Sequence, residues 1–571
     1  MRLTTVSCPS IGLLLDYLAT GYQRDIIEGV SRAVAARGAN LLLFVGGWFL
    51  DESLETEGNV IYSHVTKTSV DGAVAAMSTL INKLGADTGR KILRRIAVPC
   101  VSLGLNVPGM TSVGTDNSAG LHEMCKHLAV DHGYRRFAMI GGPEQNEESI
   151  ERIETCKKSL SGFGATLDEH HITRQGFMIG SGRAGIKELF DNRRVEPDKL
   201  DAIICASDLI AEGALLALGE RGIRVPRDIA LTGFDDLDRA RYLIPPLSSV
   251  RQPLIELGAT SARLLLQSLD GVHAPDSATL PSTAIFRGSC GCQGASASAR
   301  TSGAPRRSTG TSRALDGGLQ LMRRMDLICA SLSRAARGQF TGADLGWERR
   351  WVLGLFADLG DQQETGFLPQ LETTLGNMNK DRSQLELCQD LLGVFRDESL
   401  IALGDSNASR RLEDLVHSAR LMTSSALERL EVSRRLETTA ALNGTLFAVA
   451  RLMRLVGHPD FWTQLERELS ELGIHTCFVT RYLPGSFATS TYLFGFSSAE
   501  QLPGDLAGRS FPSAALIPNE LLRRPRPHAM LVQALVSRRQ AIGTLFLSFT
   551  AKDIATYEPF AAVIALELAR A

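Results

Sequence analysis

The stretch IGLLLDYLATGYQRDIIEGVSRAVAARGANLLLFV, residues 11–45, decides the fold class of this chain. It predicts an apolar strand over 11–15, an amphipathic helix over 23–37 and a second strand over 41–45. Short apolar strands that alternate with helices are typical of parallel sheets covered on both faces. The alternation continues to about residue 290, too far for one small sheet, and predicts an α/β domain of two lobes. Further strands are expected over 72–77, 98–103, 137–140, 202–205 and 229–232, and further helices over 118–132, 148–163, 184–192, 209–221 and 254–269.

The composition is that of an ordinary globular protein. The chain has 571 residues, 44% hydrophobic and 22% charged, so several domains are expected and widespread disorder is not. Lys and Arg number 61 against 63 Asp and Glu, and this balance excludes a chain built throughout to neutralise phosphates. No apolar run is long enough to span a membrane, and residues 1–21 lack the features of a signal peptide. The 10 scattered cysteines form no disulfide framework, so we expect a cytoplasmic protein without membrane contact.

Three further parts follow the sensing region of residues 1–293. Residues 294–314 predict a flexible linker, because Gly, Ala, Ser, Thr, Pro and Arg dominate; a basic arm that binds nucleic acid is the alternative. Residues 315–441 predict an all-helical region, and residues 442–571 a small α+β module. The elements expected in the module are a helix over 461–472, strands over 475–483, 491–496, 529–536 and 542–549, and a closing helix over 553–570.

A long apolar stripe marks the end of the helical region. Its residues recur at steps of three and four, which places them on one face of a helix. A coiled coil between two chains and a helix packed on its own neighbours both satisfy this pattern. The stripe consists of Leu412, Leu415, Ala419, Met422, Ala426, Leu430, Leu436 and Ala440.

An ordered series of motifs carries a family resemblance. It includes Val113-Gly-Thr-Asp-Asn-Ser-Ala-Gly120, Cys205-Ala-Ser-Asp208, Gly233-Phe-Asp-Asp236 and Pro245-Pro-Leu-Ser-Ser-Val-Arg-Gln252. Over about residues 10–290 the chain resembles the effector-sensing domain of LacI/GalR-type repressors. The resemblance implies a periplasmic-binding-protein-like fold. Its two lobes would comprise 10–116 with 251–275, and 117–250 with 276–290.

A narrower resemblance extends to the whole chain. Phe44-Val-Gly-Gly47, Asn59-Val-Ile-Tyr62 and Arg287-Gly-Ser-Cys-Gly-Cys292 are similar to segments of bacterial multidomain sensors. In that group a LacI-like domain is followed by a helical region, a GAF-like module and an output module. Two departures stand out: the sensing strand starts near residue 11, which leaves no room for a helix-turn-helix, and no cyclase, kinase or P-loop motif is present. We therefore expect neither direct DNA binding nor enzymatic activity.

The candidate ligand site is the set of polar residues that follow the predicted strands. Open parallel sheets bind ligands beyond the carboxyl ends of their strands. Carboxylates and amides bind paired hydroxyls, and arginine adds charge-assisted hydrogen bonds. The resemblance implies that Arg152, Asp208 and Asp235 occupy effector-contacting positions, and that Ser207 stands where relatives usually carry Asn. The full set is Asp16, Tyr22, Gln23, Ser78, Asn146, Arg152, Ser207, Asp208 and Asp235.

Several of these residues have a structural alternative. Asp208 is also placed to cap the helix that starts at residue 209. Asp235 and Asp236 are also typical turn residues, and Arg152 is also typical of an exposed helix face.

Three other patterns have functional readings that we do not adopt. Gly180-Ser-Gly-Arg-Ala-Gly185 matches GxGxxG but lies late in the second lobe, away from the first βα turn that a dinucleotide site requires. Cys290 and Cys292 are metal-ligand types, but no nearby Cys or His pair completes a tetrahedral set. His170 and His171 lie in a polar turn. We predict no metal and no cofactor.

The sequence thus predicts a non-enzymatic signalling protein that senses a sugar- or nucleoside-like effector. We expect a homodimer that transmits the signal to a partner protein and acts in transcription regulation. The alternatives are the sensor part of a diguanylate cyclase or histidine kinase system whose output module is missing or on another chain, a solute-binding protein, and a DNA-binding repressor.

Overall fold

The computed structural model divides into two compact units, residues 1–301 with 443–571 and residues 302–442, which are described separately. Within the part of the chain that it covers, no helix is long and apolar enough to cross a bilayer. The predicted linker, 294–314, lies outside the described residues. Those residues are 8–18, 21–47, 57–81, 84–292, 321–338, 340, 346–359, 366–377, 382–404, 407–498, 502, 506–518, 528–549 and 557–570.

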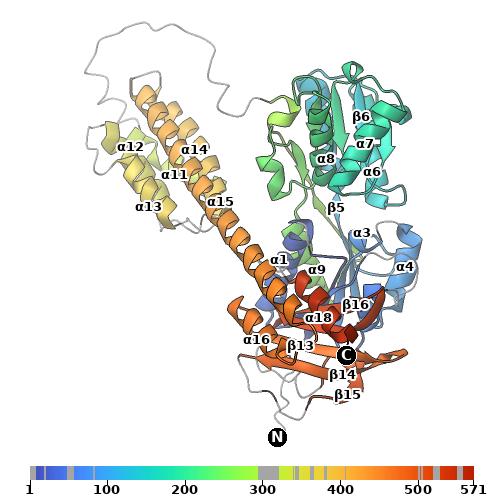
Figure 1. Cartoon of the computed structure of the whole chain (residues 1–571). Helices are drawn as coiled ribbons and strands as arrows, with labels where there is room; N and C mark the ends of the chain where they lie inside the picture. The colour runs from blue at the N-terminus through green and yellow to red at the C-terminus, as the bar shows by residue number, and fades with distance from the viewer. Residues whose placement is uncertain are drawn as a thin grey trace. The chain divides into compact units, whose positions relative to one another are not determined.

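The first lobe is a parallel sheet with the strand order β11-β5-β4-β3-β1-β2 and helices on both faces (Figure 1). Helices α1 and α9 pack on one face, and α2, α3 and α4 lie at the other. The elements are β1 (Ser10–Leu15), α1 (Gly21–Ala36), β2 (Asn40–Val45), η1 (Glu57–Asn59), α2 (Val60–Ser63), β3 (Gly72–Ala76), α3 (Met77–Leu80), α4 (Gly85–Arg95), β4 (Cys100–Leu103), β5 (Ser112–Asp116), α9 (Leu254–Leu269) and β11 (Ser277–Pro281).

The boundary predicted between the lobes near residue 275 is wrong. Strand β11 pairs in parallel with β5, Ser277 opposite Ser112, and therefore completes the first lobe. The chain returns to the second lobe only at β12 (Thr283–Ile285), which pairs with β10 (Ser249–Arg251). The pairing satisfies backbone groups at the edge of the first sheet, and this fixes where the strand belongs.

The second lobe is a four-stranded parallel sheet, ordered β7-β6-β8-β9, between two layers of helices. Its elements are α5 (Asn117–Lys126), η2 (His127–Asp131), β6 (Phe137–Gly141), α6 (Glu147–Gly162), η3 (Glu169–His171), β7 (Ile172–Arg174), α7 (Ile179–Lys187), η4 (Glu188–Asn192), η5 (Pro197–Lys199), β8 (Ala202–Cys205), α8 (Asp208–Glu220), β9 (Ala230–Thr232), η6 (Asp238–Tyr242), β10 (Ser249–Arg251), β12 (Thr283–Ile285) and η7 (Gly288–Cys290).

Glycines bring the helices of each lobe into backbone contact. A Cβ on Gly29 of α1 would lie 1.9 Å from the carbonyl oxygen of Ile255 in α9. In the second lobe a Cβ on Gly182 of α7 would lie 2.0 Å from the carbonyl oxygen of Ile210 in α8. Helix packing thus explains Gly182 of the GxGxxG pattern, since only glycine allows so close an approach.

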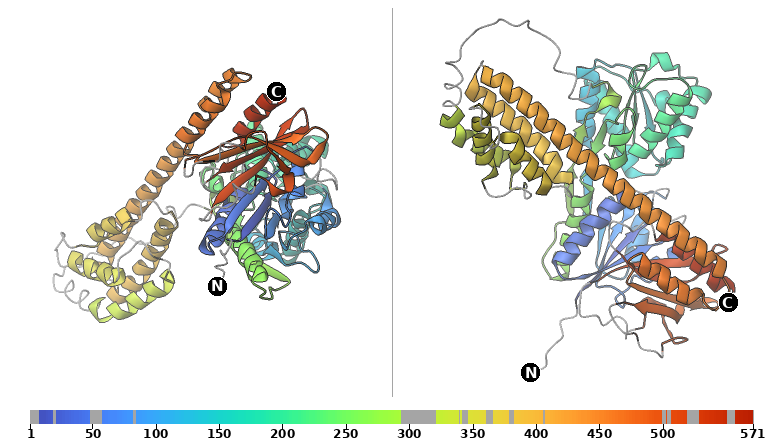
Figure 2. Two further views of the ribbon diagram at one scale, coloured as in Figure 1. Left: turned by 90° about the horizontal axis from the view of Figure 1, so that it is seen from below. Right: turned by 60° about the vertical axis from the view of Figure 1, so that its left-hand side comes forward.

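The C-terminal module continues the sheet of the first lobe. Strand β16 pairs in parallel with β2, Leu531 opposite Leu43, so that the order β2-β16-β17-β13-β14-β15 completes an 11-stranded sheet (Figure 1, Figure 2). The sequence predicts a separate module, but in the structure its apolar side chains join those of the first lobe on both faces. The elements are α16 (Phe461–Glu471), β13 (Thr476–Leu483), β14 (Ser486–Ser497), β15 (Ser510–Pro512), η9 (Ser513–Ala515), β16 (Ala529–Ser537), β17 (Gln540–Ser548) and α18 (Glu558–Arg570).

The helical unit has its own core, centred on Trp351, Phe367 and Phe395. Its last helix, α15, continues through the predicted boundary at residue 442 and ends at Leu455 (Figure 2). The left-handed Gly457 follows, which is typical of a helix end. The elements are α11 (Met325–Ala336), α12 (Trp347–Leu359), α13 (Phe367–Asn377), α14 (Arg382–Leu403) and α15 (Asn407–Leu455).

The apolar stripe predicted on α15 is largely covered by other helices of the same chain. Leu412, Ala419 and Ala426 are buried in the core of the helical unit, and Leu430 packs against it. The side chains of Leu436 and Ala440 lie outside the described residues. From Leu412 to Leu430 the stripe therefore packs against other helices of its own chain.

Candidate functional site

A cleft of about 580 Å³ opens between the two lobes. Asp16 and Ser78 enter it from just beyond β1 and β3 of the first lobe, and Ser207 and Asp235 from beyond β8 and β9 of the second. The lining residues are Asp16, Tyr17, Tyr22, Gln23, Ser78, Thr79, Glu148, Arg152, Phe177, Ser207, Leu209, Asp235 and Leu237.

All of the predicted site residues except Asn146 and Asp208 line this cleft. Asn146 instead caps α6, where its side-chain oxygen accepts a hydrogen bond from the Ser149 amide at 2.9 Å. Its amide nitrogen donates to the carbonyl oxygen of Ser78 at 3.4 Å. Asn146 therefore links the two lobes beside the cleft rather than inside it.

Asp208 is buried below the cleft. Its carboxylate accepts hydrogen bonds from the Leu237 amide at 2.7 Å and from the Ser249 hydroxyl at 2.6 Å. Burial, and then the nearby Asp235 carboxylate, raise the pKa of Asp208. The helix-capping role considered for Asp208 belongs to Ser207, whose hydroxyl oxygen accepts from the Ile210 amide at 3.2 Å. Asp208 thus holds the loop that carries Asp235.

The first-lobe wall of the cleft is a hydrogen-bonded carboxylate with an aromatic neighbour. Asp16 accepts hydrogen bonds from the Gln23 amide and the Thr79 hydroxyl, both at 3.1 Å. Tyr22 is enclosed, and burial together with the charge of Glu148 raises the pKa of its phenol. Because the Tyr22 hydroxyl stays protonated, it remains available as a donor to a ligand oxygen.

Arg152 forms the second-lobe wall. Arg152 is only 3% exposed, so the alternative that it lies on an exposed helix face is wrong. Its Nε donates to Asn117 at 3.0 Å and its Nη1 to the carbonyl oxygen of Ala206 at 2.9 Å. The guanidinium also lies 3.8 Å above the centre of the Phe234 ring and 3.6 Å from the Glu148 carboxylate. Its orientation is thus fixed before any ligand arrives.

Asp235 connects the cleft to the strands that join the lobes. Its carboxylate accepts a hydrogen bond from the side-chain Nε2 of Gln252 at 2.7 Å, and the side-chain Oε1 of Gln252 accepts one from the Thr115 hydroxyl at 2.8 Å. The backbone of Asp235 has a φ of 109°, so it is a turn residue as well as a lining residue. Two hydrogen bonds therefore connect Asp235, through Gln252, to Thr115, and both of these residues lie in segments that cross between the lobes.

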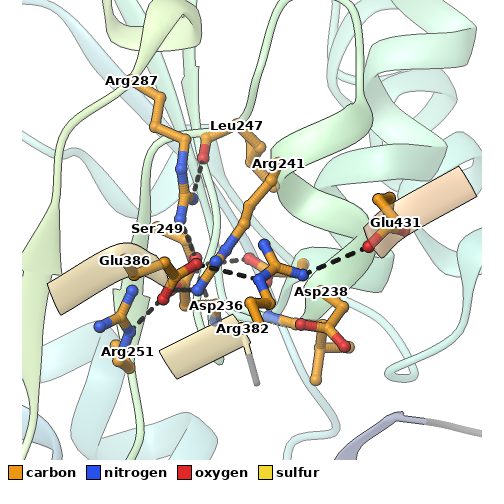
Figure 3. Close-up of polar contacts among 12 residues, drawn as sticks. Asp236, Asp238, Arg241, Leu247, Ser249, Arg251, Arg287, Arg382, Glu386 and Glu431 are labelled. Atoms are coloured by element: carbon orange, nitrogen blue, oxygen red, sulfur yellow. Dashed lines mark hydrogen bonds and ion pairs between the residues drawn. The ribbon is translucent and has the colours of Figure 1, made fainter. Parts of the chain in front are cut away.

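The adjacent Asp236 does not line the cleft. Its carboxylate pairs with Arg287 at 2.6 Å and with Arg251 at 2.8 Å, and Arg241 lies 3.8 Å away (Figure 3). Its backbone amide donates to the Ser249 hydroxyl at 3.1 Å. Of the two neighbouring carboxylates, Asp235 thus lines the cleft and Asp236 pairs with the arginines.

Sequence reasoning missed several lining residues. Tyr17 and Thr79 directly follow predicted site residues, so extending each post-strand segment by one position would have found them. Glu148 precedes Arg152 by one helical turn, which is a detectable spacing. Phe177, Leu209 and Leu237 are apolar and gave no signal that distinguishes a lining residue from a core residue.

We expect the stability of this protein to depend on pH through Asp235. Burial raises the pKa of Asp235 from 3.8 to about 7. Because the folded-state pKa lies above the unfolded-state value, protonated Asp235 contributes to the free energy of unfolding. This contribution is complete below about pH 4 and is lost as the pH rises through about 7. The free energy of unfolding should therefore fall over this range more steeply in the wild type than in Asp235→Asn. Chemical denaturation at a series of pH values tests this, and parallel curves would contradict it.

Comparison with known proteins is consistent with this architecture. A family model described as a periplasmic binding protein-like domain matches residues 126–290. The HTH-type transcriptional regulator CelR of Thermobifida fusca is 31% identical over 257 residues, 44% of this chain and 71% of that protein. The ribose operon repressor of Haemophilus influenzae is 34% identical over 267 residues, 46% of this chain and 74% of the repressor. The HTH-type transcriptional repressor PurR of Escherichia coli is 28% identical over 260 residues, 46% of this chain and 73% of the repressor.

Solved structures of similar proteins cover about half of the chain. The match to a CelR–cellobiose complex has 28% identity and a TM-score of 0.44, and it covers 50% of this chain and 85% of the CelR chain. A LacI family regulator from Mycobacterium smegmatis has 23% identity and a TM-score of 0.43, and covers 49% and 98%. On the sequence identity to CelR and to the ribose operon repressor, over more than two thirds of each, this chain belongs to the LacI family of transcriptional regulators.

Proposed function

We propose that this protein senses a sugar- or nucleoside-like molecule in the cleft between its lobes and acts in transcription regulation. The observation that carries this is the convergence of fixed polar groups from both lobes, Asp16 from one and Arg152 and Asp235 from the other. The similarity to a ribose operon repressor, and to a regulator solved with cellobiose, supports a ligand rich in hydroxyl groups.

The chemistry of the cleft suits such a ligand. Vicinal hydroxyls donate to carboxylates and accept from a guanidinium, and the Tyr22 and Phe177 rings offer faces for a sugar or a base. A ligand held from both walls binds the closed arrangement of the lobes better than the open one. It therefore shifts the population toward closure by that difference in affinity.

Calorimetry on the full chain tests the proposal. A thermal-shift screen of sugars and nucleosides identifies the ligand. Arg152→Ala and Asp235→Ala should then each weaken its binding by about 1.5–3 kcal/mol, because each removes a charged hydrogen-bonding partner. Glu220→Gln, which alters an exposed pair with Arg183 far from the cleft lining, is the control and should bind normally. Unchanged affinity in both cleft variants would refute the site.

The shared sheet suggests the route of the signal. The antiparallel order β16-β17-β13-β14-β15, with α16 and α18 against the sheet, supports a GAF-like module. Because β16 pairs with β2, the module moves with the first lobe as one body. Closure of the cleft would then change the position of the second lobe relative to that body. A partner protein that contacts both could detect the change.

We also propose that two chains pair through the end of α15. Leu442, Leu446 and Met453 follow at steps of four and seven and are exposed, Leu446 by 60%. This face differs from the stripe predicted from sequence, which from Leu412 to Leu430 packs within the chain. Steps of this kind place apolar side chains along one side of a helix, where a second copy can cover them.

Leu446→Glu should convert the dimer to a monomer. The substitution would place two like charges close together in an apolar contact, which should weaken association by at least about 10-fold. Leu446→Ile, which keeps the apolar character, is the matched control and should remain dimeric. Light scattering at tens of micromolar provides the measurement. A wild-type chain that is monomeric under these conditions would contradict the idea.

A further inference from the structure

Four side chains of metal-ligand type lie together in the second lobe, although two come from the start and two from the end of the sequence that forms it. His127 is in η2 and His132 follows it. Cys290 is the last residue of η7 and Cys292 follows it, at the end of the sensing domain. Their nearest nitrogen and sulfur atoms all lie within 4.8 Å of one another. None of them lines the ligand cleft, and the proposed function uses none of them.

The distances are those of a tetrahedral set of donors. The two Nε2 atoms of His127 and His132 are 3.1 Å apart. The Cys292 sulfur lies 3.1 Å from His127 Nε2 and 3.6 Å from His132 Nε2, and the Cys290 sulfur 3.6 Å from His127 Nε2. A zinc ion with bonds of about 2.0–2.1 Å to nitrogen and about 2.3 Å to sulfur separates two nitrogens by about 3.3 Å, and nitrogen from sulfur by about 3.6 Å. The group could close around such an ion with shifts of a few tenths of an ångström.

The surroundings orient these donors. His127 Nδ1 lies 2.8 Å from the Asp131 carboxylate, so the proton on Nδ1 leaves Nε2 with its lone pair toward the cluster. The Phe286 ring stacks on His127 with centres 3.9 Å apart. Cys290 is buried, and the His127 side chain is only 11% exposed. A carboxylate behind a ligating histidine is a common support of zinc sites.

The backbone between the cysteines is adapted to this arrangement. Gly291 has a left-handed φ of 104°. A Cβ there would lie 3.0 Å from the Tyr134 hydroxyl and 3.3 Å from His132. The Tyr134 hydroxyl also donates to the carbonyl oxygen of Cys290 at 3.2 Å. The glycine thus lets both thiols turn toward the histidines.

We propose that His127, His132, Cys290 and Cys292 bind one zinc ion, which fastens the end of the sensing domain to the second lobe. Thiolate and imidazole ligands select zinc over calcium or magnesium, and a closed set of four is typical of a structural site. The spacing of the histidines, with four residues between them, is also typical of zinc ligands. The clamp would hold the segment from Arg287 to Cys292 in place just before the chain leaves the domain.

Metal analysis of the untagged full chain tests this site. Protein expressed with added zinc should carry about one zinc per chain, and the double variant Cys290→Ser with Cys292→Ser should lose nearly all of it. His127→Gln should lose most of it as well. Cys329→Ser and His171→Gln are the matched controls and should keep it. Wild-type protein without zinc after reconstitution, or a folded double variant that retains it, would overturn the proposal.

Cobalt substitution keeps the test decisive if the cysteine variants aggregate. Cobalt bound to the wild-type chain should show the intense visible bands of a tetrahedral site and a thiolate-to-cobalt charge-transfer band. Both should disappear when zinc is added in excess. A cobalt spectrum without the thiolate band, or a disulfide between Cys290 and Cys292 in protein purified without oxidant, would exclude the zinc site.

Discussion

Leu531→Ala is expected to lower the free energy of unfolding of the unit formed by residues 1–301 and 443–571 by about 2–5 kcal/mol. Leu531 lies in β16 opposite Leu43 of β2 and is fully buried in the core that the first lobe and the C-terminal module share. Its truncation leaves a cavity where the C-terminal module joins the first lobe. Denaturant unfolding of the full chain, followed by circular dichroism, gives the measurement.

The same strand supplies the control for this experiment. Val536 lies near the end of β16 and is 36% exposed, so Val536→Ala should change stability by no more than about 0.5 kcal/mol. If the two substitutions have equal effects, the junction contributes no more than an exposed position. Two separate transitions in the wild type, with Leu531→Ala moving only one of them, would show that the module and the first lobe fold independently.

The junction also affects how the sensing domain should be studied. Removal of residues 443–571 would uncover the backbone of β2 along its whole length and the apolar side chains of both faces beside it. An open strand edge of this kind promotes aggregation. Ligand screens are therefore better carried out on the full chain than on residues 1–293.

Gly29→Ala should destabilise the first lobe by about 3 kcal/mol. The added methyl group would lie 1.9 Å from the Ile255 carbonyl oxygen, and the contact is with backbone, which no side-chain rotation relieves. Helices α1 and α9 would have to move apart and give up part of the buried contact between them. The shift in the denaturation midpoint of the full chain measures the loss.

Gly219→Ala is the matched control, and the opposite sign is expected. Gly219 lies in α8 with open space where its Cβ would stand. Alanine is favoured over glycine in a helix, so this change should stabilise the protein by about 0.5–1 kcal/mol. A stabilising effect of Gly29→Ala as well would show that the α1–α9 contact adjusts freely.

The periodicity of apolar residues was sufficient to predict most helices and strands of the sensing domain. Each predicted strand and helix of the sensing domain corresponds to an element of the structure, and β8 (Ala202–Cys205) and α9 (Leu254–Leu269) have the predicted bounds. Strands β5, β7, β10, β11 and β12 were not predicted because they are short or lack a continuous apolar run. Such strands are held by their pairing partners rather than by their own composition.

The candidate site was predictable where position in the fold determines the role. Polar residues directly after buried strands, such as Asp16 and Asp235, line the cleft because parallel strands end at the same edge. Asp208 has the same position in sequence but turns its carboxylate toward Leu237 and Ser249. The direction of a side chain depends on partners that are remote in sequence, and the pattern of residues does not contain them.

The sequence by itself determined the alternating α/β fold, the family and the edge of the sheet at which the ligand site lies, because these depend on local periodicity and ordered motifs. Only the tertiary structure decided that β16 extends the sheet at β2, almost five hundred residues away, as the hydrogen bond from His528 to Asn40 illustrates. It alone brought His127 to Cys292, 165 positions apart. Strand edges and single ligand side chains have no periodic signature, so their partners are selected by the packing of the folded chain.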